Sequence, residues 1–303
     1  MIKLLFFLGD IDTSKITDMS ELFKYSKRED FSGIETWDTS HVKNMSCMFL
    51  GAETFNEPIS NWDVSHVKDM RCMFSGAESF NQPIGKWNVS KVEYMHYMFA
   101  GAKTFNQDIG EWDISNIGSL REMFSGAKAF NQDIGKWNTF NVIDMYGMFN
   151  NAISFNQPIE NWNTSNVREM SNMFKNAKSF NQPLNNWNVS KVEEMNYMFF
   201  HADSFNQPLN KWDVSYVESM EGMFKGAKSF NQDISKWTPC YRLNYKDMGY
   251  RPKKTSIEKD KLSSTKFKFN NPKTIKFKKS NDKLKKQQKM SNLNIKDSLE
   301  KTM

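Results

Sequence analysis

The chain has 303 residues, of which 39% are hydrophobic and 25% charged, as in ordinary globular proteins. Its formal net charge of +6 is unevenly spread, because residues 239–303 hold 19 Lys and Arg against 6 Asp and Glu and leave 22 against 29 for residues 1–238. Three cysteines without a C-x-x-C pair exclude a disulfide framework and predict reduced thiols, and no apolar run approaches the roughly 18 residues of a membrane span.

The chain opens with an apolar segment, MIKLLFFLGD, at residues 1–10. This segment is at the lower length limit for a signal peptide, and no small-residue cleavage site or lipobox-type cysteine follows it. We interpret it as a cap strand, with a signal peptide as the alternative. Residues 1–36 as a whole are predicted to be a degenerate N-terminal cap repeat, in which Ile11 and Leu22 stand where later units have Trp and Met.

Residues 37–238 are predicted to form eight units of 25 residues. Counted from the Trp of each unit, Val or Ile stands at +5, Met or Leu at +8, Met at +11, Phe at +12, Ala at +15, Phe at +18, Asn at +19 and Ile or Leu at +22. A fixed period of about 20 to 50 residues is typical of a solenoid whose units share one continuous core. The Trp series has no insertion or deletion: Trp37, Trp62, Trp87, Trp112, Trp137, Trp162, Trp187, Trp212 and Trp237.

The first part of each unit predicts a helix of about three turns. The apolar positions +5, +8, +11, +12 and +15 fall on one helical face, as for Val92 to Ala102. Ser90 and Glu93 have the spacing of a capping box, and the Gly or Asn at +14 in seven of the eight units is typical of a helix end.

The second part, such as Phe80 to Ile84, predicts a strand of two to four residues or an extended segment, because Pro at +21 in five units cannot donate to a ladder. The Asn at +19 is expected to be buried and to face its counterparts in an asparagine ladder. The fold class expected is therefore an α/β repeat solenoid with one short helix and one very short strand or extended segment per unit. Strands stack at about 4.8 Å and helices at roughly 8 to 10 Å, which would make the extended face concave.

The motif F-N-Q-x-I-x-x-W-[DN]-x-S-x-V-x-x-M-x-x-M-F-x-x-A resembles the BspA-like repeat family, a relative of leucine-rich repeats first noted as Mycoplasma-type proteins of unknown function. The resemblance covers residues 37–237 and implies a right-handed, leucine-rich-repeat-like solenoid. It also implies adhesion or protein binding without enzyme activity, as reported for surface or secreted bacterial members. This chain lacks a convincing export signal and anchor, which leaves the compartment open and slightly favours an intracellular location.

The spacing of the His, Cys and acidic residues does not predict an active site or a metal site. His41 and His66 at +4 and Cys47 and Cys72 at +10 would lie about 240° apart around a helix, with neighbouring helices roughly 8 to 10 Å apart, too far for zinc or a disulfide. Stacked carboxylates such as Asp38 at +1 are expected to be charges at helix N-termini. We expect no enzyme activity, no metal and no cofactor.

Residues 239–303 form a basic tail that lacks apolar periodicity and is predicted to be disordered. Its alternating Lys and Phe have a composition that can contact phosphates and bases, although a solubilising or targeting segment gives the same composition. The residues predicted to contact a polyanion are Lys266, Lys268, Lys276, Lys278 and Lys279.

The function expected from these features is a non-enzymatic protein–protein interaction or adhesion scaffold with an unidentified protein partner. The alternative is a nucleic-acid-associated protein that binds through the tail, and a lineage-expanded repeat without a strong partner is a third possibility. The candidate binding residues are those at +21 and +23 on the expected concave face: Pro83, Gly85, Asp108, Gly110, Asp133 and Gly135.

Overall fold

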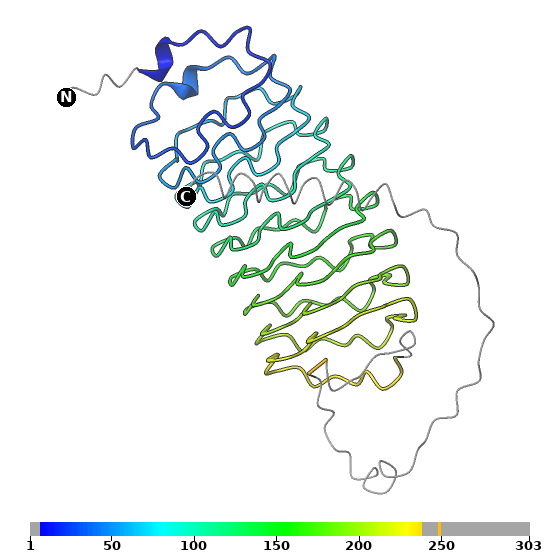
Figure 1. Ribbon diagram of the computed structural model, residues 1–303. Helices are drawn as coiled ribbons and strands as arrows, with labels where there is room; N and C mark the ends of the chain where they lie inside the picture. The colour runs from blue at the N-terminus through cyan, green and yellow to red at the C-terminus, as the bar shows by residue number, and fades with distance from the viewer. Residues whose placement is uncertain (1–6, 238–247, 250–303) are drawn as a thin grey trace, which may run out of the picture. The chain divides into compact units, whose positions relative to one another are not determined.

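The protein winds into a stack of coils, one for each 25-residue unit (Figure 1). The computed structural model describes residues 7–237 together with Met248 and Gly249. Contacts divide the chain into two units, Met1–Lys253 and Lys254–Met303, and the second of these lies outside the described residues.

The predicted α/β solenoid with a helix in each unit is wrong. The described residues contain no α-helix and no strand, and their helical elements are two 3-10 turns, η1 (Leu8–Asp10) and η2 (Ile34–Thr36). Isolated parallel β-bridges join consecutive coils at +7, for example Asn44 with Asp69 and Glu169 with Glu194. These bridges lie inside the segments that were predicted to be helical. The leucine-rich-repeat-like geometry that the resemblance implied is therefore not observed.

The predicted helix is replaced by successive four-residue turns, as the coil of Trp37 shows. The N–H of Met48 donates to the carbonyl of Met45 at 3.2 Å, and the N–H of Ala52 donates to the carbonyl of Phe49 at 3.0 Å. Between these turns, the N–H of Phe49 donates to Met73 of the next coil at 2.9 Å. An α-helix would direct every N–H to the carbonyl four residues back, whereas here alternate N–H groups hold the neighbouring coil.

Two positions in each turn segment have left-handed backbone geometry, which an α-helix cannot contain. In the coil of Trp37 they are Cys47 at +10, with φ 57°, and Gly51 at +14, with φ 69°. The same geometry recurs at +10 and +14 in all eight units and at Glu21 and Tyr25 of the first repeat. The Gly and Asn residues at +14 therefore belong to repeated turns and do not end a helix.

The core consists of aromatic rings that stack from coil to coil. Trp137 stacks on Trp162 with ring centroids 6.4 Å apart and planes 3° from parallel. Within one coil, Phe149 stacks on Phe155 at 3.9 Å, and Phe149 also stacks on Phe124 of the preceding coil at 5.8 Å. The nine Trp residues are between 3 and 6% exposed. The predicted in-register contact between like side chains is confirmed.

The Asn residues at +19 join the coils along another side of the stack, which confirms the predicted ladder. The backbone N–H of Asn131 donates to the side-chain oxygen of Asn106 at 2.9 Å, and that of Asn156 donates to Asn131 at 2.8 Å. These Asn residues are half-buried or exposed and not buried as expected. Because side chains join the coils here, the Pro at +21 interrupts no backbone ladder among the described residues.

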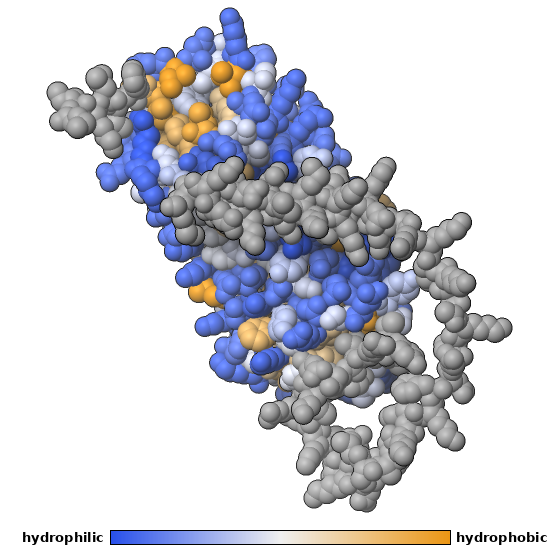
Figure 2. Space-filling model, viewed as in Figure 1, coloured by the Kyte–Doolittle hydropathy of each residue, from blue (hydrophilic) through white to orange (hydrophobic). Residues whose placement is uncertain are grey.

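The first repeat exposes apolar side chains at the N-terminal end of the stack, where Figure 2 shows hydrophobic surface. Ile11 and Leu22, predicted to stand in for core residues, are 47% and 52% exposed. The predicted cap strand is wrong over η1, whose Leu8 carbonyl accepts a hydrogen bond from the Trp37 indole at 2.8 Å. Residues 1–6 lie outside the described residues.

At the other end, one residue of the predicted tail belongs to the core. Met248 is 1% exposed, and its carbonyl accepts a hydrogen bond from the N–H of Phe224 at 2.8 Å. It stands at +11 from Trp237, so the repeat continues in part beyond the last Trp. In the part of the chain that the structure describes, no helix is long and apolar enough to cross a membrane.

Candidate functional site

The residues predicted to line a concave binding face lie at +21 and +23 on one side of the stack: Pro83, Gly85, Asp108, Gly110, Asp133 and Gly135. Asp108 and Asp133 are exposed, and each accepts a hydrogen bond from the backbone N–H two residues on, at 3.0 and 2.8 Å. Their carboxylates close local turns. The reason given for a concave surface was wide helix spacing opposite, and this reason is wrong because the described coils contain no α-helix.

The glycines at +23 have a packing role on the same side. A Cβ on Gly85 would lie 2.1 Å from the carbonyl oxygen of Asp108 in the next coil, and one on Gly110 would lie 2.4 Å from that of Asp133. Near the C-terminal end of the described coils, a hollow of about 280 Å³ lies on this side, lined by Pro208, Asn210, Gln232, Asp233 and Lys236. Whether this side binds a partner stays a prediction.

The Asp residues at +1 close turns and do not sit at helix N-termini. The side chain of Asp38 accepts hydrogen bonds from the N–H and the hydroxyl of Ser40, at 2.9 and 2.7 Å. These hydrogen bonds hold the pKa of Asp38 below its ordinary value. His41 and His66 are exposed, and among the described residues no three His, Cys, Asp or Glu side chains come together to hold a metal. The tail lysines Lys266, Lys268, Lys276, Lys278 and Lys279 lie outside the described residues.

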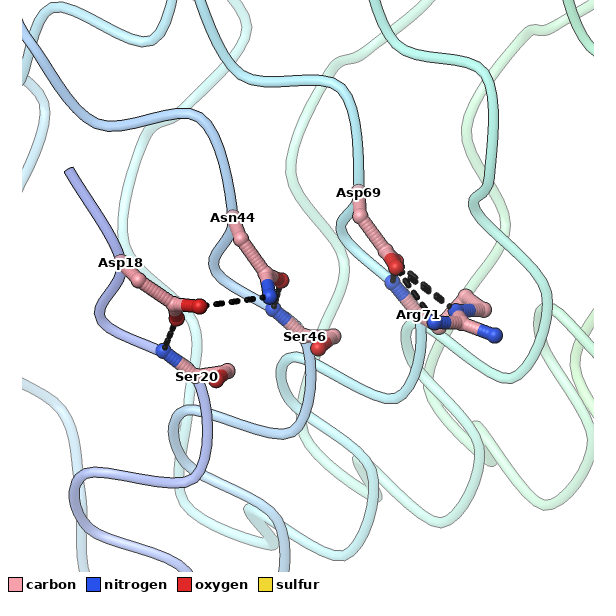
Figure 3. Close-up of polar contacts among 6 residues, drawn as sticks. All are labelled: Asp18, Ser20, Asn44, Ser46, Asp69 and Arg71. Atoms are coloured by element: carbon pink, nitrogen blue, oxygen red, sulfur yellow. Dashed lines mark hydrogen bonds and ion pairs between the residues drawn. The ribbon is translucent and has the colours of Figure 1, made fainter.

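A different surface runs along the β-bridges, and we call it the bridge face. It consists of the side chains at +7, +9 and +10 of each coil, which surround the buried Met or Leu at +8. Figure 3 shows its N-terminal part, where Asp18, Asn44 and Asp69 lie in a row. Each of these +7 side chains accepts a hydrogen bond from the backbone N–H two residues on, at 2.8 to 3.0 Å. In these three coils the +7 side chain therefore stabilises the turn.

Arg121, at +9, is the centre of a polar cluster on the bridge face. Its Nε donates to the hydroxyl of Tyr97 at 3.2 Å, and its Nη1 donates to Oδ2 of Asp144 at 3.4 Å. The guanidinium carbon lies 3.9 Å from the centroid of the Tyr146 ring, within the range of a cation–π contact. These three contacts hold the guanidinium against the Tyr146 ring on the bridge face.

Arg71 and His96 occupy the same +9 position in the two preceding coils. Arg71 donates from Nε to both carboxylate oxygens of Asp69 at 2.9 Å, and its guanidinium lies 5.4 Å from the Tyr94 ring centroid. Burial of His96, with the positive charges of Arg71 and Arg121, lowers the pKa of its imidazole to about 4. At neutral pH the central coils therefore present two guanidinium groups with a neutral imidazole between them.

Towards the C-terminal end, the bridge face becomes acidic. Burial raises the pKa of Glu169, and burial together with the negative charge of Glu169 raises that of Glu194. In the described coils neither carboxylate forms an ion pair, although Glu169 accepts a hydrogen bond from the N–H of Ser171 at 2.7 Å. One coil further, Glu221 accepts a hydrogen bond from the hydroxyl of Tyr197. Over the central coils the face thus carries two guanidinium groups whose charge is offset by Asp69, Glu122 and Asp144, and in the described coils from that of Trp162 onward its charged groups are all carboxylates.

The expectations from sequence did not include the bridge face, because +7, +9 and +10 were assigned to a helix. The missed signal was the contrast between positions of the repeat. Met at +11 and Phe at +12 never change across the eight units, whereas +9 changes in almost every unit, in the order Ser46, Arg71, His96, Arg121, Tyr146, Ser171, Asn196 and Glu221. All of these side chains are exposed or half-buried except Ser171, which is 4% exposed, and repeat proteins bind partners through such extended surfaces.

Comparison with known families agrees with the repeat. Residues 6–111, 95–208, 158–262 and 180–292 each match the family described as "Mycoplasma protein of unknown function, DUF285". The four overlapping matches extend over nearly the whole chain, as a tandem repeat produces. No curated protein matches the chain.

Proposed function

The chain belongs to the family of Mycoplasma proteins of unknown function, DUF285, and we propose that it is a non-enzymatic scaffold that binds a protein partner through its bridge face. The observation that carries the proposal is the gathering of Arg, His, Tyr and Glu at the variable +9 and +10 positions on one surface. Arg and Tyr are the residues most enriched where proteins bind one another.

The central cluster supports a binding role because its side chains are held in place before any partner arrives. Arg121 is fixed by Tyr97, Asp144 and the Tyr146 ring, so little side-chain entropy remains to be lost on binding. Its Nε and Nη1 already donate to Tyr97 and Asp144, and the remaining N–H groups on its two Nη atoms can bind a carboxylate of a partner with two parallel hydrogen bonds.

In the described coils, the two guanidinium groups of the bridge face lie only on the central coils and carboxylates without an ion pair lie towards the C-terminal end, which favours a partner with both acidic and basic groups. Acidic groups of the partner would lie over Arg71 and Arg121, and basic groups would lie over Glu169, Glu194 and Glu221. A nucleic acid fits this face less well, because its phosphates would meet the acidic coils. We also propose that the chain is related to the BspA-like repeat proteins, which would make adhesion its biological role.

The second candidate is nucleic-acid association through the basic tail. It is favoured by one observation, the 19 Lys and Arg against 6 Asp and Glu in residues 239–303. Binding that depends on phosphate contacts falls steeply between about 50 and 200 mM salt.

Proximity labelling in the native cell with the full-length protein tests the proposal. The informative variant is Arg71→Ala with Arg121→Ala, and the matched control is Lys136→Ala with Lys191→Ala, which removes the same charge from exposed positions outside the bridge face. A third chain carries Gln in place of Lys266, Lys268, Lys276, Lys278 and Lys279. We expect one set of protein partners to be lost from the arginine variant and kept by the other two chains.

One result would contradict the proposal, and another would support the second candidate. Partners that persist in the arginine variant would show that the bridge face does not bind them. Loss of nucleic acid from the tail variant alone, with a steep salt dependence, would favour the second candidate.

A further inference from the structure

Cys47 and Cys72 occupy the same position, +10, in neighbouring coils. The backbone holds them in register, because the N–H of Cys47 donates to the carbonyl of Arg71 at 2.7 Å and the N–H of Phe49 donates to Met73 at 2.9 Å. Segments joined by such a ladder lie about 4.8 Å apart, which is inside the Cα separation of roughly 4.4 to 6.8 Å that a disulfide needs. Both thiols are free, as expected, but the wide helix spacing that was the reason for excluding a disulfide is not observed in the described coils.

Side chains at +10 extend towards the next coil. A Cβ placed on Gly147 would lie 2.9 Å from Cγ of Glu122, and a Cβ placed on Gly222 would lie 2.5 Å from Cδ1 of Tyr197. In the first pair the γ atom at +10 of one coil lies beside the position of the β carbon at +10 of the next, and in the second pair the δ carbon does. For Cys47 the γ atom is sulfur, so it lies within bonding reach of the Cys72 side chain.

We propose that Cys47 and Cys72 are a paired thiol site that a hydroperoxide oxidises to a disulfide joining two neighbouring coils. Both thiols are free and half-buried, which leaves them accessible to a small oxidant such as hydrogen peroxide. In the first step the Cys47 thiolate attacks one peroxide oxygen, the O–O bond breaks, and the departing oxygen leaves with a proton as water. Cys47 is then a sulfenic acid.

In the second step the Cys72 sulfur, on losing its proton, attacks the Cys47 sulfur, the S–O bond breaks and a second water leaves. Two thiols are thus oxidised by two electrons, and one hydrogen peroxide is reduced to two waters. The hydrogen bond with Cys72 lowers the pKa of Cys47, with Lys24 and Arg71 acting in the same direction and burial and Glu21 opposing it. Interaction with Cys47 and burial raise the pKa of Cys72, which suits Cys47 to be the attacking sulfur.

Tryptic mapping of the full-length protein after hydrogen peroxide treatment tests this site. Cleavage after Lys43, Lys68, Arg71 and Lys86 places the two cysteines on separate peptides, residues 44–68 and 72–86. We expect these peptides to be recovered linked, lighter than their sum by two hydrogens, and to separate again on treatment with dithiothreitol. Cys240 falls on the peptide of residues 237–242, so a bond to that cysteine gives a different mass.

Three variants complete the test. Cys240→Ser should form the link at the rate of the native protein. Cys72→Gly should form no link and should leave a Cys47 sulfenic acid that dimedone traps, and Gly suits this position because Gly147 and Gly222 already occupy +10. The double variant Cys47→Ser, Ser46→Cys keeps three thiols but moves one out of register, and it should form the link at least about tenfold more slowly.

The proposal is overturned if the link forms equally fast in the out-of-register variant, because register would then be irrelevant. It is also overturned if peroxide converts Cys47 and Cys72 to sulfinic acids, or joins either to Cys240, without the expected link. Circular dichroism of each variant before treatment establishes that the coils have formed, so that a missing link reports on the thiols.

Discussion

Each 25-residue unit contributes side chains both to the core and to the bridge face, but the core side chains are nearly the same in every unit and those of the bridge face differ. Inward, every unit repeats the same Met at +11 and the same Phe at +12. Both side chains are buried, and each Phe ring stacks on its counterpart one coil away. On the bridge face, the +9 side chain changes from Ser46 to Arg71, His96 and Arg121 within four successive coils. Stacking therefore restricts each inward position to similar residues, whereas outward positions can hold different residues in different coils.

The two regions also differ in how they should respond to substitution. Loss of an inward side chain opens a cavity in a core shared by neighbouring coils, whereas loss of a bridge-face side chain exposes a surface that water can occupy. Substitutions of inward residues should therefore cost more stability than substitutions on the bridge face.

Trp137→Ala should lower the free energy of unfolding by about 3 to 5 kcal/mol. The ring is 4% exposed, stacks on Trp162, and donates from its indole N–H to the Ile109 carbonyl at 3.1 Å. Urea unfolding followed by circular dichroism measures the change. A loss under about 1 kcal/mol would mean that the ring is not part of the shared core.

Gly110→Ala should lower the free energy of unfolding by about 1 to 3 kcal/mol, because its Cβ would lie 2.4 Å from the Asp133 carbonyl oxygen. Gly118→Ala is the matched control, since its nearest contact would be 4.0 Å away at the Asn141 carbonyl. Thermal unfolding of both variants provides the comparison. Equal losses would show that the close approach of the coils at +23 is not what requires glycine.

Arg121→Ala should change the free energy of unfolding by less than about 1 kcal/mol, because its ion pair with Asp144 is partly exposed. The same variant should lose a partner that the Lys136→Ala variant keeps. Urea unfolding and capture of the labelled partner measure the two effects separately. A large loss of stability with binding unchanged would place Arg121 with the structural residues of the coil and not with the binding surface.

Glu169→Gln should change the pH dependence of stability. Burial raises the folded-state pKa of Glu169 above its ordinary value of 4.5, so its contribution favours folding below that value and is lost as the pH rises through the folded-state pKa. The variant should therefore gain stability relative to the native protein as the pH rises above 4.5.

Urea midpoints at several pH values measure this small effect. Glu218→Gln, at an exposed position, is the control and should show less dependence on pH. A gain that is the same at every pH would mean that the charge of Glu169 is not what costs stability.

Several features of the fold could be predicted because they depend only on the period of 25 residues. The Trp and Phe stacks and the Asn ladder follow from like residues meeting like, and Asn131 bonds to Asn106 and Asn156 as expected. The bridge face could not be predicted in the same way, because an incorrect helix hid which of its positions face outward. Its members, such as Arg71 and Arg121, come from units that differ, and no single unit contains the surface.

The period, the register of the coils and most of the inward side chains follow from the order of the amino acids, because repeated spacing decides which residues can touch. The choice between a helix and successive turns depends on contacts between coils, since the apolar spacing of Met45, Met48, Phe49 and Ala52 suits both. The deciding hydrogen bonds run between coils, as from Phe49 to Met73, and they exist only once the coils have stacked. The same close stacking brings Cys47 and Cys72 together and aligns the guanidinium groups along the bridge face.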